Sequence, residues 1–140
     1  MGCDDGPMTL ETLQVILRVG LAGVFAVMGV LHFVPKVARG MRAMIPAPLR
    51  RPGWPAALVV FTGVCELAGA AGLLVPWPGL RLAAGICLAV FLIAVFPANA
   101  VAARDPERFG RTAIPFWPRL GLQVLLIVLV IAAAWPLGGL

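Results

Sequence analysis

The chain has 140 residues, of which 61% are hydrophobic and 12% charged, and its formal net charge is +5 at pH 7. Its mean hydropathy of +1.01 argues against a soluble globular domain and against a disordered chain. No run of like charges offers an extended face for nucleic acid. We therefore expect an integral membrane protein in a lipid bilayer.

The beginning of the chain is acidic, with Asp4, Asp5 and soon Glu11. A cleavable signal peptide begins with basic residues instead. We therefore expect the first apolar stretch to remain in the mature protein, preceded by a short N-terminal segment, residues 1–12.

Four apolar stretches follow, at about residues 13–34, 55–75, 80–103 and 116–135. Each is close to the roughly 20 residues with which a helix crosses the hydrocarbon core of a bilayer. A chain this short cannot close a barrel, and helices otherwise satisfy their own backbone polar groups in lipid. The sequence thus predicts an all-α fold: one transmembrane domain, residues 13–136, built as a four-helix bundle with short loops.

Prolines and tryptophans mark the ends of these stretches. Of the 13 prolines, only Pro97 lies away from an expected end, and its missing N–H should bend the third span. The four tryptophans stand at the two ends of the second span and of the fourth, as in an aromatic belt at the membrane interfaces. They are Trp54, Trp77, Trp117 and Trp135.

The connection between the first two spans has a helical pattern of its own. Lys36, Arg39 and Arg42 recur at helical spacing, and the apolar residues between them lie mostly on another side. This pattern is typical of an amphipathic helix in the membrane interface. We expect such a helix at residues 36–45, with a solvated loop as the alternative.

Basic residues are concentrated in the first and third connections. The opposite side has Arg81 at most, with Arg18 buried nearby. Because positively charged loops stay in the cytoplasm, we expect these two loops to be cytoplasmic and both termini extracytoplasmic. The eight residues are Lys36, Arg39, Arg42, Arg50, Arg51, Arg104, Arg108 and Arg111.

Ionisable side chains inside the spans are the first candidates for function, since each costs about 2.5 to 3.5 kcal/mol to insert. Glu66 falls near the bilayer centre, and Arg18 lies about 6 Å from it along the axis at about 1.5 Å per residue. We predict an Arg18–Glu66 ion pair, in which the guanidinium satisfies the carboxylate. The pair either locks the first two helices together or makes Glu66 a proton carrier or ligand anchor.

Four further polar residues, His32, Asn99, Arg119 and Gln123, are expected in the cytoplasmic half, too far from Glu66 in depth to form a compact dyad with it. His32 is either a hydrogen-bonded structural residue or the best candidate for proton exchange. Asn99 either satisfies the backbone loosened by the nearby proline or presents its amide to a headgroup or a quinone oxygen.

Motifs for known cofactors are missing. There is no nucleotide-binding loop, zinc signature, haem attachment or nucleophile elbow, so no metal and no covalent cofactor are expected. The three cysteines, Cys3, Cys65 and Cys87, form no CxxC pair, and the last two lie in apolar runs as packing residues.

Ordered blocks of sequence between Arg18 and Trp117 resemble the DoxX-like family of small four-helix membrane proteins. The blocks are HFVP (32–35), MIP (44–46), TGVCELAG (62–69), GLLVP (72–76), RLAA (81–84) and VFPAN (95–99). The resemblance implies a bundle in the bacterial inner membrane and places Arg18 and Glu66 at polar positions of that family. The wider group includes the small subunit of thiosulfate:quinone oxidoreductase, proteins linked to thiol stress, and membrane assembly or trafficking factors.

Three functions are compatible with these features. The first is an accessory or quinone-proximal subunit of a membrane redox complex, whose partner carries the electrons. The second is a non-enzymatic scaffold or assembly chaperone that binds a protein partner or a second copy through small-residue faces. The third is a small-solute or proton pathway lined by Arg18, Glu66 and His32.

Overall fold

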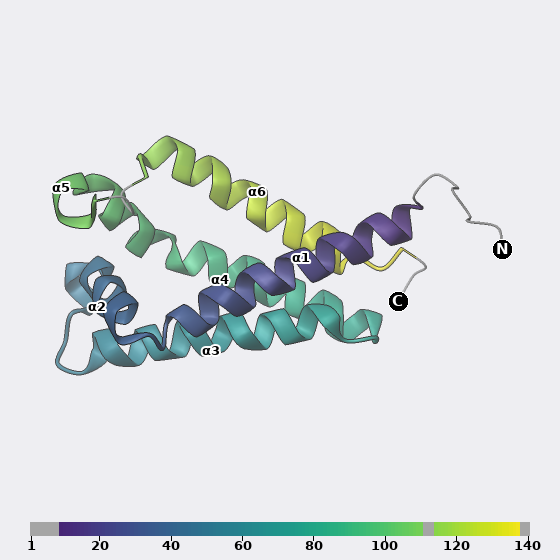
Figure 1. The fold of residues 1–140 in the computed structure, drawn as a ribbon, viewed down its shortest axis with the longest axis horizontal. Helices are drawn as coiled ribbons and strands as arrows, with labels where there is room; N and C mark the ends of the chain where they lie inside the picture. The colour runs from purple at the N-terminus through teal and green to yellow at the C-terminus, as the bar shows by residue number, and fades with distance from the viewer. Residues whose placement is uncertain (1–8, 111–113, 138–140) are drawn as a thin grey trace.

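The computed structural model describes residues 9–110 and 114–137, and within them it contains four long helices and no strand (Figure 1). These are α1 (Leu10–Leu31), α3 (Trp54–Leu74), α4 (Pro78–Arg104) and α6 (Phe116–Ala134). All four are long and apolar enough to cross a membrane. The chain is therefore a multi-pass membrane protein, and the predicted all-α four-helix bundle is confirmed. Cys3, Arg111 and most of the expected N-terminal segment 1–12 lie outside the described residues.

The first span begins and ends three residues earlier than the sequence predicts. Thr9 is its N-cap, and its hydroxyl accepts a hydrogen bond from the Thr12 N–H at 3.2 Å. Pro35 disfavours helical geometry at Val34, which is extended with φ −79° and ψ 118°. Local capping chemistry, rather than hydropathy, thus sets both ends of α1.

The connection after α1 contains the expected helix, α2 (Pro35–Met44). Its apolar face buries Ala38 against Ile45 and Val59 of α3, and its three basic side chains are exposed. Arg50 closes the end of this helix: its guanidinium donates to the Ile45 carbonyl at 2.7 Å and to the Ala43 carbonyl at 3.0 Å. The helical interpretation of this connection is therefore correct, and the loop alternative is wrong.

Two short helices at the same end of the molecule were not expected. They are η1 (Ala47–Leu49) and α5 (Pro106–Phe109). In α5 the Asp105 carboxylate accepts a hydrogen bond from the Arg108 N–H at 3.1 Å, which caps the helix. Figure 1 shows α2 and α5 together at the end of the bundle opposite to both termini.

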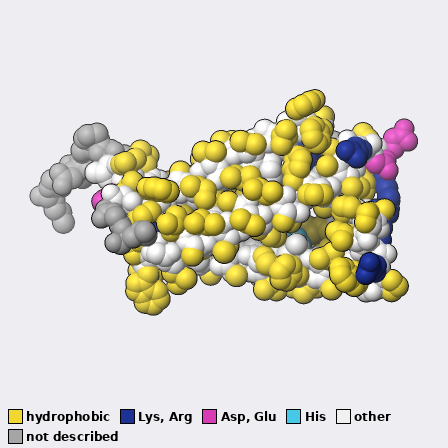
Figure 2. All heavy atoms as spheres, turned by 180° about the vertical axis from the view of Figure 1, so that it is seen from behind, with side chains coloured by type: hydrophobic (Ala, Val, Ile, Leu, Met, Phe, Trp, Pro, Cys, Tyr) yellow, Lys and Arg dark blue, Asp and Glu magenta, His cyan; other side chains and the backbone are white. Residues whose placement is uncertain are grey.

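The four long helices form a closed ring. α1 packs along α3, α3 along α4 and α4 along α6, while α1 and α6 contact each other over a shorter stretch. Inward-facing apolar side chains from all four helices make one core, and outward-facing ones cover the sides of the bundle as a lipid-facing surface (Figure 2). The core consists of Leu21, Ala22, Phe25, Ala70, Leu73, Leu88, Leu92, Val130, Ala133 and Ala134.

Glycines set the closest approach between α1 and α3. A Cβ added to Gly29 would lie 3.0 Å from the Gly63 carbonyl oxygen, and one added to Gly63 would lie 2.6 Å from the His32 Cβ. Lipid provides no hydrophobic drive for helix association. Van der Waals contact between closely packed backbones stabilises the helix pair instead. This crossing fixes how far α1 is shifted along α3.

The two ends of the bundle differ in charge. Figure 2 shows most of the charged side chains gathered at the end that carries α2 and α5. The tryptophans divide evenly, with Trp54 and Trp117 at this charged end and Trp77 and Trp135 at the other. All four are between 48% and 75% exposed, which agrees with an aromatic belt at each interface.

Candidate functional site: polar clusters inside the bundle

The central polar pair of the bundle joins α1 to α3. The Nδ1 atom of His32 lies 3.3 Å from Oε2 of Glu66, and both side chains are about nine-tenths buried. The same Nδ1 is 2.8 Å from the Met28 carbonyl, and Glu66 Oε2 has no hydrogen-bond partner in the part of the chain that the structure describes. Along α3, Glu66 lies about 18 Å from Trp54 and about 12 Å from Leu74, so the pair is deep in the hydrocarbon.

The directions of the side chains explain why these two residues meet. Helical side chains lean toward the N-terminus of their own helix. α1 and α3 are antiparallel, so Glu66 leans toward the charged end while His32, at the end of α1, leans back toward the bundle centre. The two groups therefore converge, and the prediction that His32 lies too far in depth from Glu66 is wrong.

Glu66 pairs with His32 instead of with Arg18, contrary to the predicted ion pair. Arg18 lies eleven residues before Gly29, about 16 Å, whereas Glu66 lies only three residues beyond Gly63, about 5 Å in the same direction. The glycine crossing thus separates them by about 12 Å along the bundle. Arg18 also leans away from Glu66, and its Nη2 donates to the Gln14 Oε1 at 2.8 Å.

A second polar cluster ties α1 to the end of α6. The buried Gln14 donates from Nε2 to the carbonyls of Ala132, at 2.9 Å, and Trp135, at 2.7 Å. Carbonyls in the last turn of a helix have no partner within the helix, so Gln14 satisfies them from outside. Gln14 occupies the same inward stripe as Arg18 and Leu21, and this spacing is the sequence signal that could have identified it.

Replacing Gln14 with leucine should lower the free energy of unfolding by about 1 to 2 kcal/mol, since two interhelical hydrogen bonds at about 0.6 kcal/mol each are lost and two carbonyls are left without a donor. Unfolding in mixed micelles, followed by circular dichroism, measures the change. Val15→Leu is the control, because Val15 is the next residue and is 49% exposed. Equal stability of the two variants would contradict a stabilising role for the hydrogen bonds from Gln14 to the end of α6.

A third cluster links α4 to α6 near the charged end. The Nη1 atom of Arg119 donates to the Asn99 Oδ1 at 3.0 Å, and the side chain of Gln123 donates from Nε2 to the Leu92 carbonyl. Leu92 is in the turn before Pro97, whose missing N–H leaves a carbonyl of that turn without its usual donor. Gln123, rather than Asn99, therefore reaches the backbone beside the proline, and α4 continues as one helix through it.

Five of the six candidate polar residues thus divide into an acid–base pair and a separate α4–α6 link, while Arg18 is hydrogen-bonded to Gln14. The pair, His32 and Glu66, can exchange a proton or bind one polar group of a ligand, because imidazole and carboxyl both donate and accept. Within residues 9–110 and 114–137, no three His, Cys, Asp or Glu side chains come together as a metal site would require.

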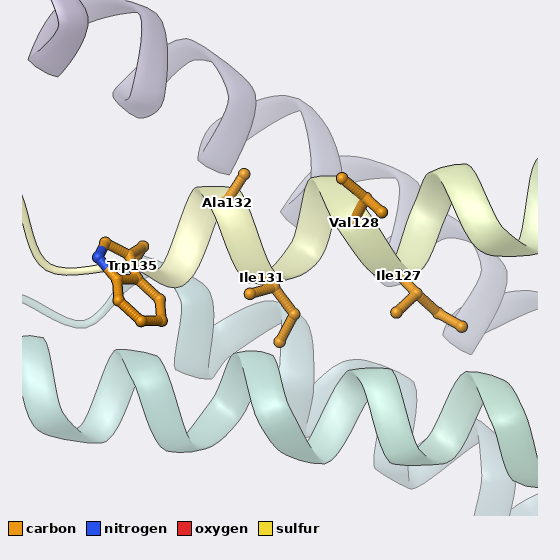
Figure 3. A pocket seen from close by; sticks show the side chains of 5 residues that line it. All are labelled: Ile127, Val128, Ile131, Ala132 and Trp135. Atoms are coloured by element: carbon orange, nitrogen blue, oxygen red, sulfur yellow. The ribbon is translucent and has the colours of Figure 1, made fainter.

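Two open apolar grooves lie at the end of the bundle opposite α2 and α5, on either side of the end of α6. One, of about 510 Å³, is lined by side chains of α6 and its C-cap, from Ile127 to Trp135 (Figure 3). The other, of about 350 Å³, lies between the start of α1 and the end of α6, where Leu10, Leu13 and Gln14 face Ala132 and Trp135. Neither groove is lined by His32 or Glu66.

The chain belongs to the family described as a domain of unknown function (DUF8561), whose family model matches residues 21–134. His32 and Glu66 lie within the matched region, and Gln14 and Arg18 precede it. No curated protein and no solved structure matches the chain.

Proposed function

We propose that the protein is an accessory subunit of a membrane redox complex and that the pair His32–Glu66 forms a quinone-proximal polar site. The observation that carries the proposal is this buried acid–base pair, with Nδ1 and Oε2 3.3 Å apart inside a membrane-spanning bundle. A buried ionisable residue in a span is by default a functional candidate. The sequence resemblance to DoxX-like proteins, some of which are subunits of a quinone oxidoreductase, supports the same assignment.

The residues present are suited to the head group of a quinone. Glu66 Oε2 is buried and has no hydrogen bond within the described chain, so it can accept from a quinol hydroxyl or, when protonated, donate to a quinone carbonyl. A bound quinone would supply the redox chemistry, and its reduction takes up one proton for each electron. The pair would hold and pass protons, while the partner subunit would provide the electrons.

Loss of the carboxyl group should abolish this role without disrupting the fold. Glu66→Gln keeps the size of the side chain, so we expect it to remove quinone that copurifies with the wild-type protein and to slow quinone reduction by native membranes. Extraction of bound lipid with chromatography, and an assay of membrane quinone reduction, measure the two effects.

Cys65→Ala is the matched control, because Cys65 precedes Glu66 on α3, is only partly buried and carries no ionisable carboxyl group. It should retain the wild-type behaviour. Absence of quinone from the wild-type extract, together with unchanged reduction in Glu66→Gln membranes, would overturn the proposal.

The proposed location is the bacterial inner membrane, with the charged end in the cytoplasm. Exposed lysine and arginine side chains of α2, α5 and the loop after α2 support this orientation. A reporter enzyme active only in the cytoplasm should work when inserted after Arg51 and fail when inserted after Trp77. The opposite result would reverse the orientation.

The second candidate is a scaffold that binds another membrane protein through α6. This helix is the least covered span: 17% of its most apolar window is buried, against 28 to 33% for the others. A photocrosslinker at Val128, on the groove of Figure 3, should capture one defined partner in native membranes. The same probe at Val90, on the outer face of α4, is the control, and capture by neither would remove this candidate.

A further inference from the structure

Two arginines lie near each other at the end of the bundle opposite α2 and α5, with no acidic partner among residues 9–110 and 114–137. Arg18 of α1 and Arg81 of α4 are close enough for their positive charges to act on each other. The Nε atoms of both are buried and make no hydrogen bond in the described chain. Glu11, the acid of the first turn of α1, is exposed and forms no ion pair within the described residues.

This arrangement is incomplete without an anion. Two neighbouring guanidiniums repel each other, and a buried N–H donor without a partner costs about 1 to 3 kcal/mol. A phosphate or carboxylate between them would remove both penalties, because guanidinium N–H groups match the oxygens of such anions.

The depth of the two arginines in the membrane indicates which kind of anion they would bind. Arg81 is in the first turn of α4, directly after Trp77, and the α1–α3 crossing places Arg18 level with the end of α3. Trp77 and Trp135 lie at this level, and both are exposed, which is typical of an aromatic belt at a membrane interface. The arginines therefore lie at the depth of lipid phosphates.

We propose that Arg18 and Arg81 form a binding site for an anionic phospholipid, with its phosphodiester on the two guanidiniums. The charge of the site and its depth favour a lipid over free phosphate. This site lies about 12 Å along the bundle from His32–Glu66, so it does not depend on the proposed redox role.

The test uses the full chain purified in detergent and titrated with phosphatidylglycerol or phosphatidylcholine, with bound lipid counted by native mass spectrometry. The wild type should bind phosphatidylglycerol more tightly than phosphatidylcholine. Arg81→Gln should weaken phosphatidylglycerol binding about tenfold, as expected for a lost charge-assisted hydrogen bond. Because the buried Nε of Arg81 makes no hydrogen bond to the described residues, this variant should fold, and circular dichroism checks that it does.

Arg42→Gln is the matched control, since Arg42 is an exposed cation at the opposite end and should leave the affinity unchanged. Arg18→Gln should weaken binding as Arg81→Gln does. Equal affinity for the two lipids, or an equal loss in Arg42→Gln, would overturn the proposal. Full displacement of the lipid by inorganic phosphate would assign the site to a free anion and overturn its lipid part.

Discussion

Replacing His32 with leucine should lower the free energy of unfolding by about 3 to 5 kcal/mol, the cost of removing one partner of a buried pair. Leucine preserves the apolar volume between α1 and α3 but leaves the Glu66 carboxyl without the imidazole that lies 3.3 Å away. Reversible unfolding of the purified protein in mixed micelles, followed by circular dichroism, measures the loss. Val30→Leu is the control, because Val30 is on the same helix and is 55% exposed.

The double variant His32→Leu with Glu66→Met distinguishes the loss of the polar interaction from a change in packing. Replacing a buried pair with apolar residues of similar volume is often neutral, so the double variant should recover most of the stability lost by His32→Leu. If the double variant is less stable than His32→Leu alone, the carboxyl group has another partner and the pair is not the source of the effect.

The four spans could be predicted because hydropathy and the positions of proline and tryptophan report directly on membrane crossing. The α2 helix could be predicted as well, since its basic and apolar residues separate at helical spacing. Both signals come from neighbouring residues on one helix. They do not depend on how the helices are shifted along each other.

The polar contacts depend on that shift, and for this reason the partner of Glu66 could not be predicted. Aligning the spans by their apolar ends places Arg18 about 6 Å from Glu66, whereas the Gly29–Gly63 crossing places it about 12 Å away. Apolar side chains along a span are nearly equivalent in hydropathy, so their pattern does not fix the register. Two glycines that permit close backbone contact do fix it.

The hydrogen bonds from Gln14 to the end of α6 could not be predicted for a different reason. Its partners are backbone carbonyls at the end of α6, and every residue has a carbonyl, so no pattern of side chains indicates them. The spacing of Gln14 from Arg18 and Leu21 shows that it faces inward, but not what it meets. Polar residues on an inward stripe near the end of a span are therefore worth testing against the ends of the neighbouring helices.

A methyl group at Gly63 should disrupt both the crossing and the polar pair. The added Cβ would lie 2.6 Å from the His32 Cβ, 3.0 Å from the Phe33 ring and 3.1 Å from the Gly29 carbonyl oxygen. Real Cβ atoms do not approach this closely, so α1 must move away from α3. We expect Gly63→Ala to lower the free energy of unfolding by about 3 kcal/mol, the upper end of the usual cost of overpacking.

Gly23→Ala is the matched control for this prediction. A Cβ at Gly23 would meet nothing within 4 Å, and alanine favours the helix by up to about 1 kcal/mol, so this variant should be as stable as the wild type or more so. Gly63→Ala should in addition shift the imidazole NMR signals of His32, the single histidine of the chain, because the clash acts directly on its Cβ. Wild-type stability with unshifted signals would show that α1 and α3 do not cross at these glycines, and the contact between His32 and Glu66 would then lose its structural basis.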